Sequence, residues 1–113
     1  MFTESRIDKM NIKELQERIK NADEARGWDI AFLSQTFTHL IEEIGEIGRH
    51  ILFRDGYKTG DLSREVNDEE FGKELADAVI FLVKIANAQG IDLDEIIQKK
   101  ANKNWNERFP VGE

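Results

Sequence analysis

Apolar residues recur every three or four positions along most of the chain, which is the spacing of amphipathic helices. A first such segment covers residues 12–22. Asn11 and Glu14 at its start have the spacing of a capping box, and Gly27 follows it as a stop signal. A longer apolar stripe occupies residues 32–53 and stops before Gly56. Its members are Phe37, Leu40, Ile41, Ile44, Ile47 and Ile51. The pattern therefore predicts two helices in the first half of the chain.

Residues that typically start and end helices also occur in the second half of the chain. Asn67 and the acidic residues after it form a capping signal for a third helix, which we expect to run to about residue 89, before Gly90. Asp92 opens a fourth helix, and Pro110 closes it. Residues 54–66 form the one substantial predicted loop, and strand-like alternation is almost absent. We expect an all-α fold, a small four-helix bundle, as a single domain over residues 1–113.

The third predicted helix is apolar around almost its whole circumference at residues 79–83, which predicts a central, buried helix. A chain of 113 residues cannot easily cover such a helix and also leave a ligand pocket. We therefore expect an oligomer in which a partner subunit supplies one wall.

Composition excludes several classes of protein. The chain has no cysteine, which excludes disulfides, zinc–thiolate sites and thiol catalysis. Its 23 acidic and 16 basic residues give a net charge of −7, unfavourable for non-specific binding to nucleic acids or anionic membranes. An anionic ligand would need local Lys or Arg, or a metal ion. No targeting or spanning segment is visible, so we expect a soluble cytoplasmic protein.

Two acidic clusters lie on the predicted second and third helices. At about 100° per residue, Glu43 and Glu46 fall on the flank of the apolar stripe, whereas Glu42 points further towards solvent. Glu74 and Asp77 border an apolar strip of the third helix. A charge in such a place is costly unless it is paired or bound to a metal. We therefore predict a recessed pocket of about four carboxylates between two facing helices.

Other interpretations of these residues remain open at this point. Lys73 and Lys84 lie on the same side of the helix as Asp77 and could neutralise it. The oxygen ligands suit Mg²⁺ or Mn²⁺ better than iron, because a di-iron bundle would need Glu-x-x-His pairs. His39 and His50 share the acidic flank, either as supporting partners of the carboxylates or as ordinary packed or surface histidines.

The last helix offers cations for a phosphate. Lys100, Asn104 and Arg108 are spaced i, i+4, i+8 and share one face, on which Arg108 could bind two phosphate oxygens. Alternatively, Lys100 and Arg108 are cations near a helix C-terminus, where the dipole favours them. Trp28 and Trp105 are candidates to stack on a nucleobase, although a packing role is the commoner one for Trp.

The acidic spacing resembles that of a known family. Glu42-Glu43-Ile-Gly-Glu46, then 27 residues, then Glu74-Leu-Ala-Asp77 is similar to the EExxE…ExxD pattern of the MazG-like, all-α nucleoside triphosphate pyrophosphohydrolases. Residues 100–109 resemble the closing helix of that family, and the likeness covers roughly residues 28–110.

The resemblance implies Mg²⁺-dependent hydrolysis of a (d)NTP between the α and β phosphates, giving (d)NMP and pyrophosphate, in nucleotide-pool housekeeping. It also implies a homodimer or homotetramer with active sites near the subunit interface. Glu43, Glu46, Glu74 and Asp77 match the metal ligands of the family. Glu42 matches the preceding glutamate, a supporting residue or a base, and either Glu42 or Glu46 could accept the proton of the attacking water.

Two other functions are considered as alternatives to this one. One is a phosphoribosyl-ATP pyrophosphohydrolase of histidine synthesis, in the same superfamily. The other is a non-catalytic helical interaction module whose acidic residues are merely surface. No GxxxxGK[ST] loop is present, so P-loop chemistry at the γ-phosphate is not expected.

Overall fold

The computed structural model describes residues 9–56 and 67–108, with only the backbone for residues 104–108. Within these ranges it contains four α-helices, one 3₁₀ turn and no strand, which confirms the all-α prediction. The elements are α1 (Ile12–Arg26), η2 (Trp28–Ile30), α2 (Leu33–Arg54), α3 (Asp68–Ala88) and α4 (Leu93–Arg108). None of the described helices is both long enough and apolar enough to cross a membrane.

The predicted capping residues set the ends of the helices. The Asn11 side chain accepts the backbone N–H of Glu14 at 2.8 Å, and the Glu14 carboxylate accepts the N–H of Asn11 at 3.0 Å. Asn67 and Asp92 each accept the N–H three residues further on, at 3.0 Å. Gly27 ends α1 with a φ of 74°, a left-handed conformation that favours glycine.

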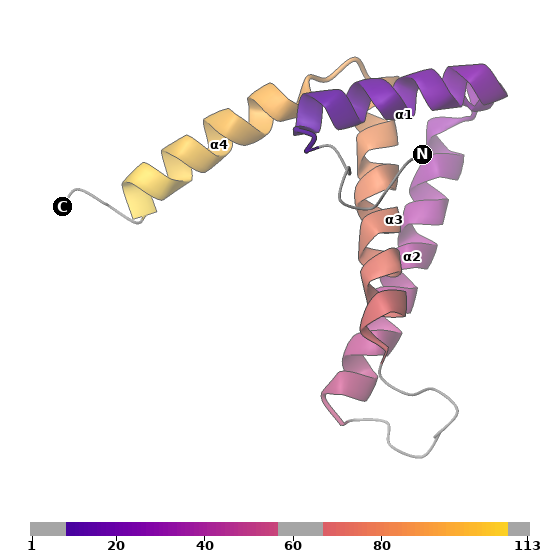
Figure 1. Cartoon of the computed structure of the whole chain (residues 1–113), viewed down its shortest axis with the longest axis vertical. Helices are drawn as coiled ribbons and strands as arrows, with labels where there is room; N and C mark the ends of the chain where they lie inside the picture. The colour runs from indigo at the N-terminus through magenta and orange to yellow at the C-terminus, as the bar shows by residue number, and fades with distance from the viewer. Residues whose placement is uncertain (1–8, 57–66, 109–113) are drawn as a thin grey trace, which may run out of the picture.

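The helices do not close into a compact bundle within one chain. α2 and α3 lie side by side as an antiparallel pair and make the most extensive contact, while α1 crosses one end of this pair (Figure 1). α4 leads away from the pair as a separate arm, on which Ile96 and Ile97 are exposed. The number of helices was therefore predicted correctly, whereas their closure into a bundle was not.

The hydrophobic core of the single chain is small, and α3 is buried along only part of its circumference. Leu40, Val83 and Ala86 are buried, with Val83 only 1% exposed. Val79 and Leu82, in contrast, are 47% and 50% exposed. Within one chain, α1 and α2 therefore cover only some sides of α3, as expected for a chain too short to cover this helix alone.

A buried glutamine joins α1, α3 and the start of α4. The Gln16 amide donates to the Asn87 side chain at 3.1 Å and to the carbonyl of Ile91 at 3.0 Å, and it accepts the N–H of Leu93 at 2.9 Å. The Asn87 side chain in turn donates to the carbonyl of Gln16 at 3.1 Å. Because a buried polar group is costly to leave unpaired, this network fixes the point at which α4 leaves the rest of the chain.

Candidate functional site

Three of the predicted carboxylates meet between α2 and α3. Glu43 lies in the middle of α2, and Glu74 and Asp77 lie one turn apart on α3. One carboxylate oxygen from each lies within 4.8 Å of the other two. Glu43 and Glu74 are half-buried, whereas Asp77 is exposed. The antiparallel packing of the two helices therefore brings both acidic motifs to one place.

These carboxylates repel one another when all are ionised. Glu43 Oε1 and Glu74 Oε2 are buried and have no hydrogen-bond partner among the described residues. A hydrogen bond between these two groups becomes possible only when one carries a proton. That bond, burial of Glu43, and the negative charges of Glu74, Asp77 and Glu46 together raise the pKa of Glu43 to about 7.

The cluster fits a divalent cation. All three donors are carboxylate oxygens, the ligands that Mg²⁺ and Mn²⁺ prefer. A cation would also satisfy the two buried oxygens that have no hydrogen-bond donor. The residues present are therefore chemically suited to hold such an ion.

Neither lysine beside Asp77 neutralises it. Lys73 pairs with Glu70 at 3.6 Å, and Lys84 pairs with Asp23 of α1 at 3.1 Å. The alternative in which one of these lysines occupies the acidic cluster is wrong, because each lysine has a carboxylate partner elsewhere.

The remaining two acidic residues of α2 have partners of their own. Both carboxylate oxygens of Glu46 accept from the guanidinium of Arg49, so Glu46 stands outside the group of three. Sequence reasoning missed Arg49, although its i, i+3 spacing from Glu46 was a usable signal. The Glu42 side chain is 66% exposed, as predicted, and contacts His39 Nδ1 at 3.1 Å.

Both histidines of the chain pack against phenylalanines of α3. The ring of His39 stacks on Phe81 with centroids 5.8 Å apart, and that of His50 stacks on Phe71 at 5.2 Å. His50 is half-buried, in agreement with its interpretation as a packed residue, whereas the His39 side chain is 61% exposed and also contacts Glu42.

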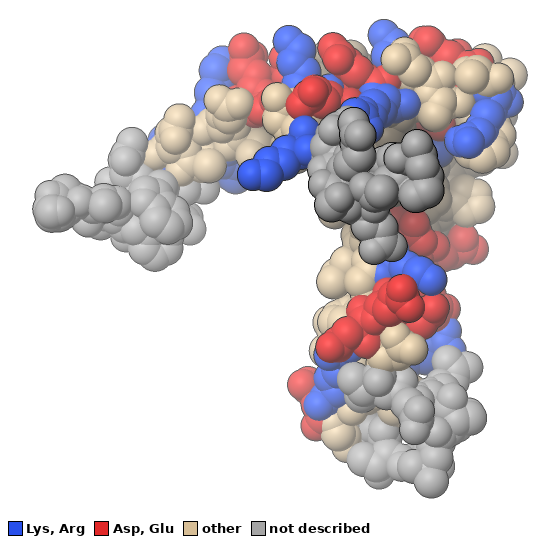
Figure 2. All heavy atoms as spheres, viewed as in Figure 1, with Lys and Arg blue, Asp and Glu red and all other residues tan. Residues whose placement is uncertain are grey.

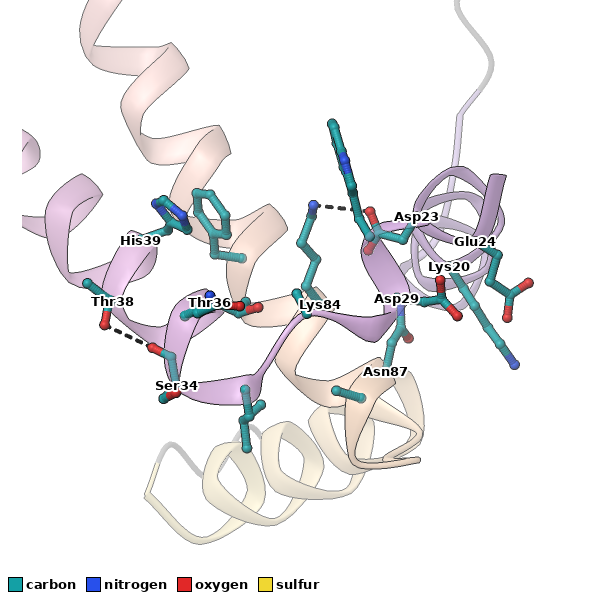
Figure 3. A pocket seen from close by; sticks show the side chains of 16 residues that line it. Lys20, Asp23, Glu24, Asp29, Ser34, Thr36, Thr38, His39, Lys84 and Asn87 are labelled. Atoms are coloured by element: carbon teal, nitrogen blue, oxygen red, sulfur yellow. Dashed lines mark hydrogen bonds and ion pairs between the residues drawn. The ribbon is translucent and has the colours of Figure 1, made fainter. Parts of the chain in front are cut away.

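A cavity of about 840 Å³ lies near the acidic cluster, although none of the three carboxylates lines it. It lies between α1, η2, the start of α2 and the end of α3 (Figure 3). Trp28, 54% exposed, is among its lining residues, together with His39 and Phe81. His39 is one helical turn before Glu43, and Phe81 is one turn after Asp77, so the cavity begins about one turn from the carboxylates. Trp28 is thus placed beside a cavity large enough for a small molecule.

The candidate phosphate clamp lies apart from the carboxylates in one chain. Lys100 is exposed on α4, which leads away from α2 and α3 (Figure 1). Asn104, Trp105 and Arg108 belong to α4, but their side chains lie outside the described residues. The fold of a single chain therefore does not bring Lys100 to the acidic cluster.

Surface charges of both signs are mixed on one face of the molecule. On the side shown in Figure 2, Lys and Arg alternate with Asp and Glu along the described helices. The acidic cluster consequently differs from this surrounding surface in having three carboxylates without a cationic partner among the described residues.

The raised pKa of Glu43 predicts a pH dependence of stability in the presence of a chelator. Folding raises this pKa from 4.5 to about 7, so the folded chain binds the proton more tightly than the unfolded chain does. The resulting stabilisation is complete below about pH 4.5 and is lost as the pH rises through about 7. Urea unfolding between pH 5 and 8 should show this loss in the wild type and in the control Glu42→Gln. Glu43→Gln should flatten it, and an unchanged slope in Glu43→Gln would contradict the assignment.

No family model matches the chain, and no curated protein or solved structure matches it significantly. The functional assignment consequently depends on the acidic motifs and on the geometry that brings them together.

Proposed function

We propose that the chain is a Mg²⁺-dependent nucleoside triphosphate pyrophosphohydrolase of the MazG-like type. It would cleave a (d)NTP between the α and β phosphates, giving (d)NMP and pyrophosphate, and would act in nucleotide-pool housekeeping. The observation that carries the proposal is the convergence of Glu43, Glu74 and Asp77 within 4.8 Å of one another. These residues come from the two motifs whose spacing resembles that family.

The three carboxylates would hold the divalent cation. Glu46 joins them only if its bonds with Arg49 are released. Bound Mg²⁺, or Mn²⁺ in its place, would supply positive charge against the triphosphate and Lewis acidity at a phosphoryl oxygen. A chain with a net charge of −7 repels a triphosphate, and such a cation would offset this repulsion together with local Lys and Arg side chains.

The resemblance suggests roles for the other site residues. Glu42 and Glu46 are the candidates to accept a proton from the attacking water. Trp28 lines the neighbouring cavity, where it would stack on the base. Lys100, Asn104 and Arg108 would hold the outer phosphates. Since α4 leads away from the cluster of its own chain, the α4 arm of another copy is the natural source of this clamp.

A second copy would also cover the apolar surface that one chain exposes. Leu75, Val79 and Leu82 form an exposed stripe on α3. The exposed stripe on α2 consists of Phe37, Ile41, Ile44 and Ile51. Helical-wheel positions put the two stripes on the same side of the antiparallel pair.

Exposed apolar stripes of this length on one side of a helix pair are typical of an interface between subunits. A homodimer or homotetramer is therefore part of the proposal.

Magnesium distinguishes this enzyme from a non-catalytic helical module with the same apolar stripes. With Mg²⁺ at ten times its dissociation constant, binding stabilises the fold by about 1.4 kcal/mol, a rise in Tm of about 5 °C or more. The wild type and the control Glu69→Gln, an exposed carboxylate at the start of α3, should show this rise in a thermal-shift titration. Glu74→Gln should not. A wild type that does not respond to millimolar Mg²⁺ would favour the interaction module.

A substrate panel distinguishes hydrolysis of free nucleoside triphosphates from hydrolysis of phosphoribosyl-ATP. Ribo- and deoxyribonucleoside triphosphates and phosphoribosyl-ATP should be incubated separately with the protein and Mg²⁺, and pyrophosphate should be measured. Release from free triphosphates supports the proposal, whereas release from phosphoribosyl-ATP alone would assign the chain to histidine synthesis.

A further inference from the structure

The cavity beside the acidic cluster contains an ion pair that the proposed chemistry does not use. Lys84 Nζ of α3 lies 3.1 Å from Asp23 Oδ1 of α1, and Figure 3 shows the lysine reaching across to this carboxylate. The Asp23 and Lys84 side chains are only 14% and 21% exposed, and both line the cavity. Lys84 Nζ is also 5.0 Å from the ring centroid of Trp28 and 5.7 Å from that of Phe81. A charged donor and a charged acceptor thus stand together between two aromatic rings.

The position of this pair relative to the carboxylates matches the length of a nucleotide. Lys84 lies seven residues after Asp77, which is two turns, or about 10.5 Å along α3. The cavity covers part of this stretch, because Phe81, which lines it, lies one turn after Asp77 on α3. With the phosphates at the acidic cluster, the nucleoside would occupy the cavity and the edge of its base would reach Asp23 and Lys84.

The chemistry of the pair restricts which base edge fits it. A carboxylate can only accept hydrogen bonds, whereas a lysine ammonium can only donate them and retains two N–H groups after pairing with Asp23. Guanine presents two neighbouring N–H donors beside a carbonyl oxygen, so it can satisfy both carboxylate oxygens and the ammonium at once. Adenine, cytosine and uracil each present a single N–H donor group on that edge, so they cannot make the bidentate contact with the carboxylate.

We propose that Asp23 and Lys84 read the edge of the base and make guanine nucleotides the preferred substrates. Trp28 would stack on the base while the Asp23 carboxylate accepts its two N–H groups and Lys84 donates to its carbonyl oxygen. The placement of the phosphates rests on the proposed function, whereas recognition of the base depends only on the cavity and the pair.

If the pair of Asp23 and Lys84 had only a structural role, its removal would have a different effect. In that role the pair would link α1 to α3 and contribute to stability. Its removal would change the activity on all nucleotides by the same factor. Base recognition instead predicts a change in the ranking of nucleotides. The ratio of activities on GTP and ATP is therefore the informative quantity.

The kinetic test compares kcat/KM for GTP, ATP, CTP and UTP. The wild type should prefer GTP by roughly 10- to 100-fold, the discrimination typical of one bidentate contact with a base. Asp23→Asn should lose most of this preference, because activity on GTP falls more than activity on ATP, and Lys84→Gln should reduce it in the same direction. The control is Glu17→Gln, an exposed carboxylate of α1 outside the cavity lining, which should keep the wild-type ranking. Equal use of all four bases, or an equal loss for all of them in Asp23→Asn, would overturn the inference.

A binding measurement keeps the inference separate from the proposed function. GMP and AMP should be titrated by calorimetry in the presence of a chelator, so that neither hydrolysis nor a metal ion is required. Binding of GMP at least tenfold tighter than that of AMP, and lost in Asp23→Asn, supports base recognition even if no triphosphate is hydrolysed. Equal affinities, or no binding of either nucleotide, would overturn it even if hydrolysis is found. Circular dichroism of each variant confirms that its helices are intact.

Discussion

Replacing Glu74 with glutamine is expected to reduce nucleotide hydrolysis at least 100-fold while leaving the helical content unchanged. Substitutions around metal ligands already cost about 10- to 100-fold, so loss of a ligand oxygen should cost more. Glu43→Gln, Glu46→Gln and Asp77→Asn are expected to have effects of similar size. Steady-state kinetics at saturating Mg²⁺, with circular dichroism of each variant, measures both quantities.

Glu43→Gln, Glu74→Gln and Asp77→Asn should not destabilise the protein in the absence of metal, whereas Glu46→Gln also loses the bonds with Arg49. Removing one charge from a cluster of carboxylates relieves their repulsion, so Tm measured in a chelator should hold or rise. The matched control is Glu69→Gln, which changes the same residue type on the same helix without entering the cluster and should retain activity within about 2-fold. Retained activity in two or more of the four variants would contradict the site.

Substituting lysine for Leu82 is expected to convert the oligomer into a monomer. Leu82 is half exposed on α3 in one chain, so lysine is tolerated there by the isolated chain. In an interface it would bury an unpaired charge at a cost of about 3–5 kcal/mol, which weakens association by two to three orders of magnitude or more. The activity should fall with the oligomer if the α4 arm of another copy completes the site.

Light scattering at micromolar concentration measures this effect. The wild type should have at least twice the chain mass of 13.1 kDa. Ile30→Lys is the control, because Ile30 is 83% exposed on η2 and lies on neither stripe. A monomeric wild type with full activity would exclude the proposed assembly.

Local features of the fold were predictable because they depend on neighbouring residues. Asn11 with Glu14, and Asn67, act as caps through hydrogen bonds that span three residues, so their spacing alone predicted the helix starts. The helical period likewise put Glu43 and Glu74 on the flanks of apolar stripes, which is why their convergence could be anticipated.

Features that depend on contacts between residues far apart in the sequence could not be predicted from local patterns. The sequence predicted that one chain would leave part of α3 uncovered, but not which side, because the helix is apolar around its whole circumference and the exposure of Val79 depends on where α1 and α2 pack. The direction of α4 depends on the bonds of Gln16 with residues far along the chain. The pairing of Lys84 with Asp23 joins two helices whose contact no local pattern reveals.

The most direct test of the proposed function is to identify which phosphate bond the protein cleaves. The protein should be incubated with a nucleoside triphosphate and Mg²⁺, and inorganic phosphate should be assayed before and after addition of inorganic pyrophosphatase. The proposed function predicts a nucleoside monophosphate as product and a phosphate signal only after the pyrophosphatase is added. Immediate release of phosphate with a nucleoside diphosphate as product would contradict it.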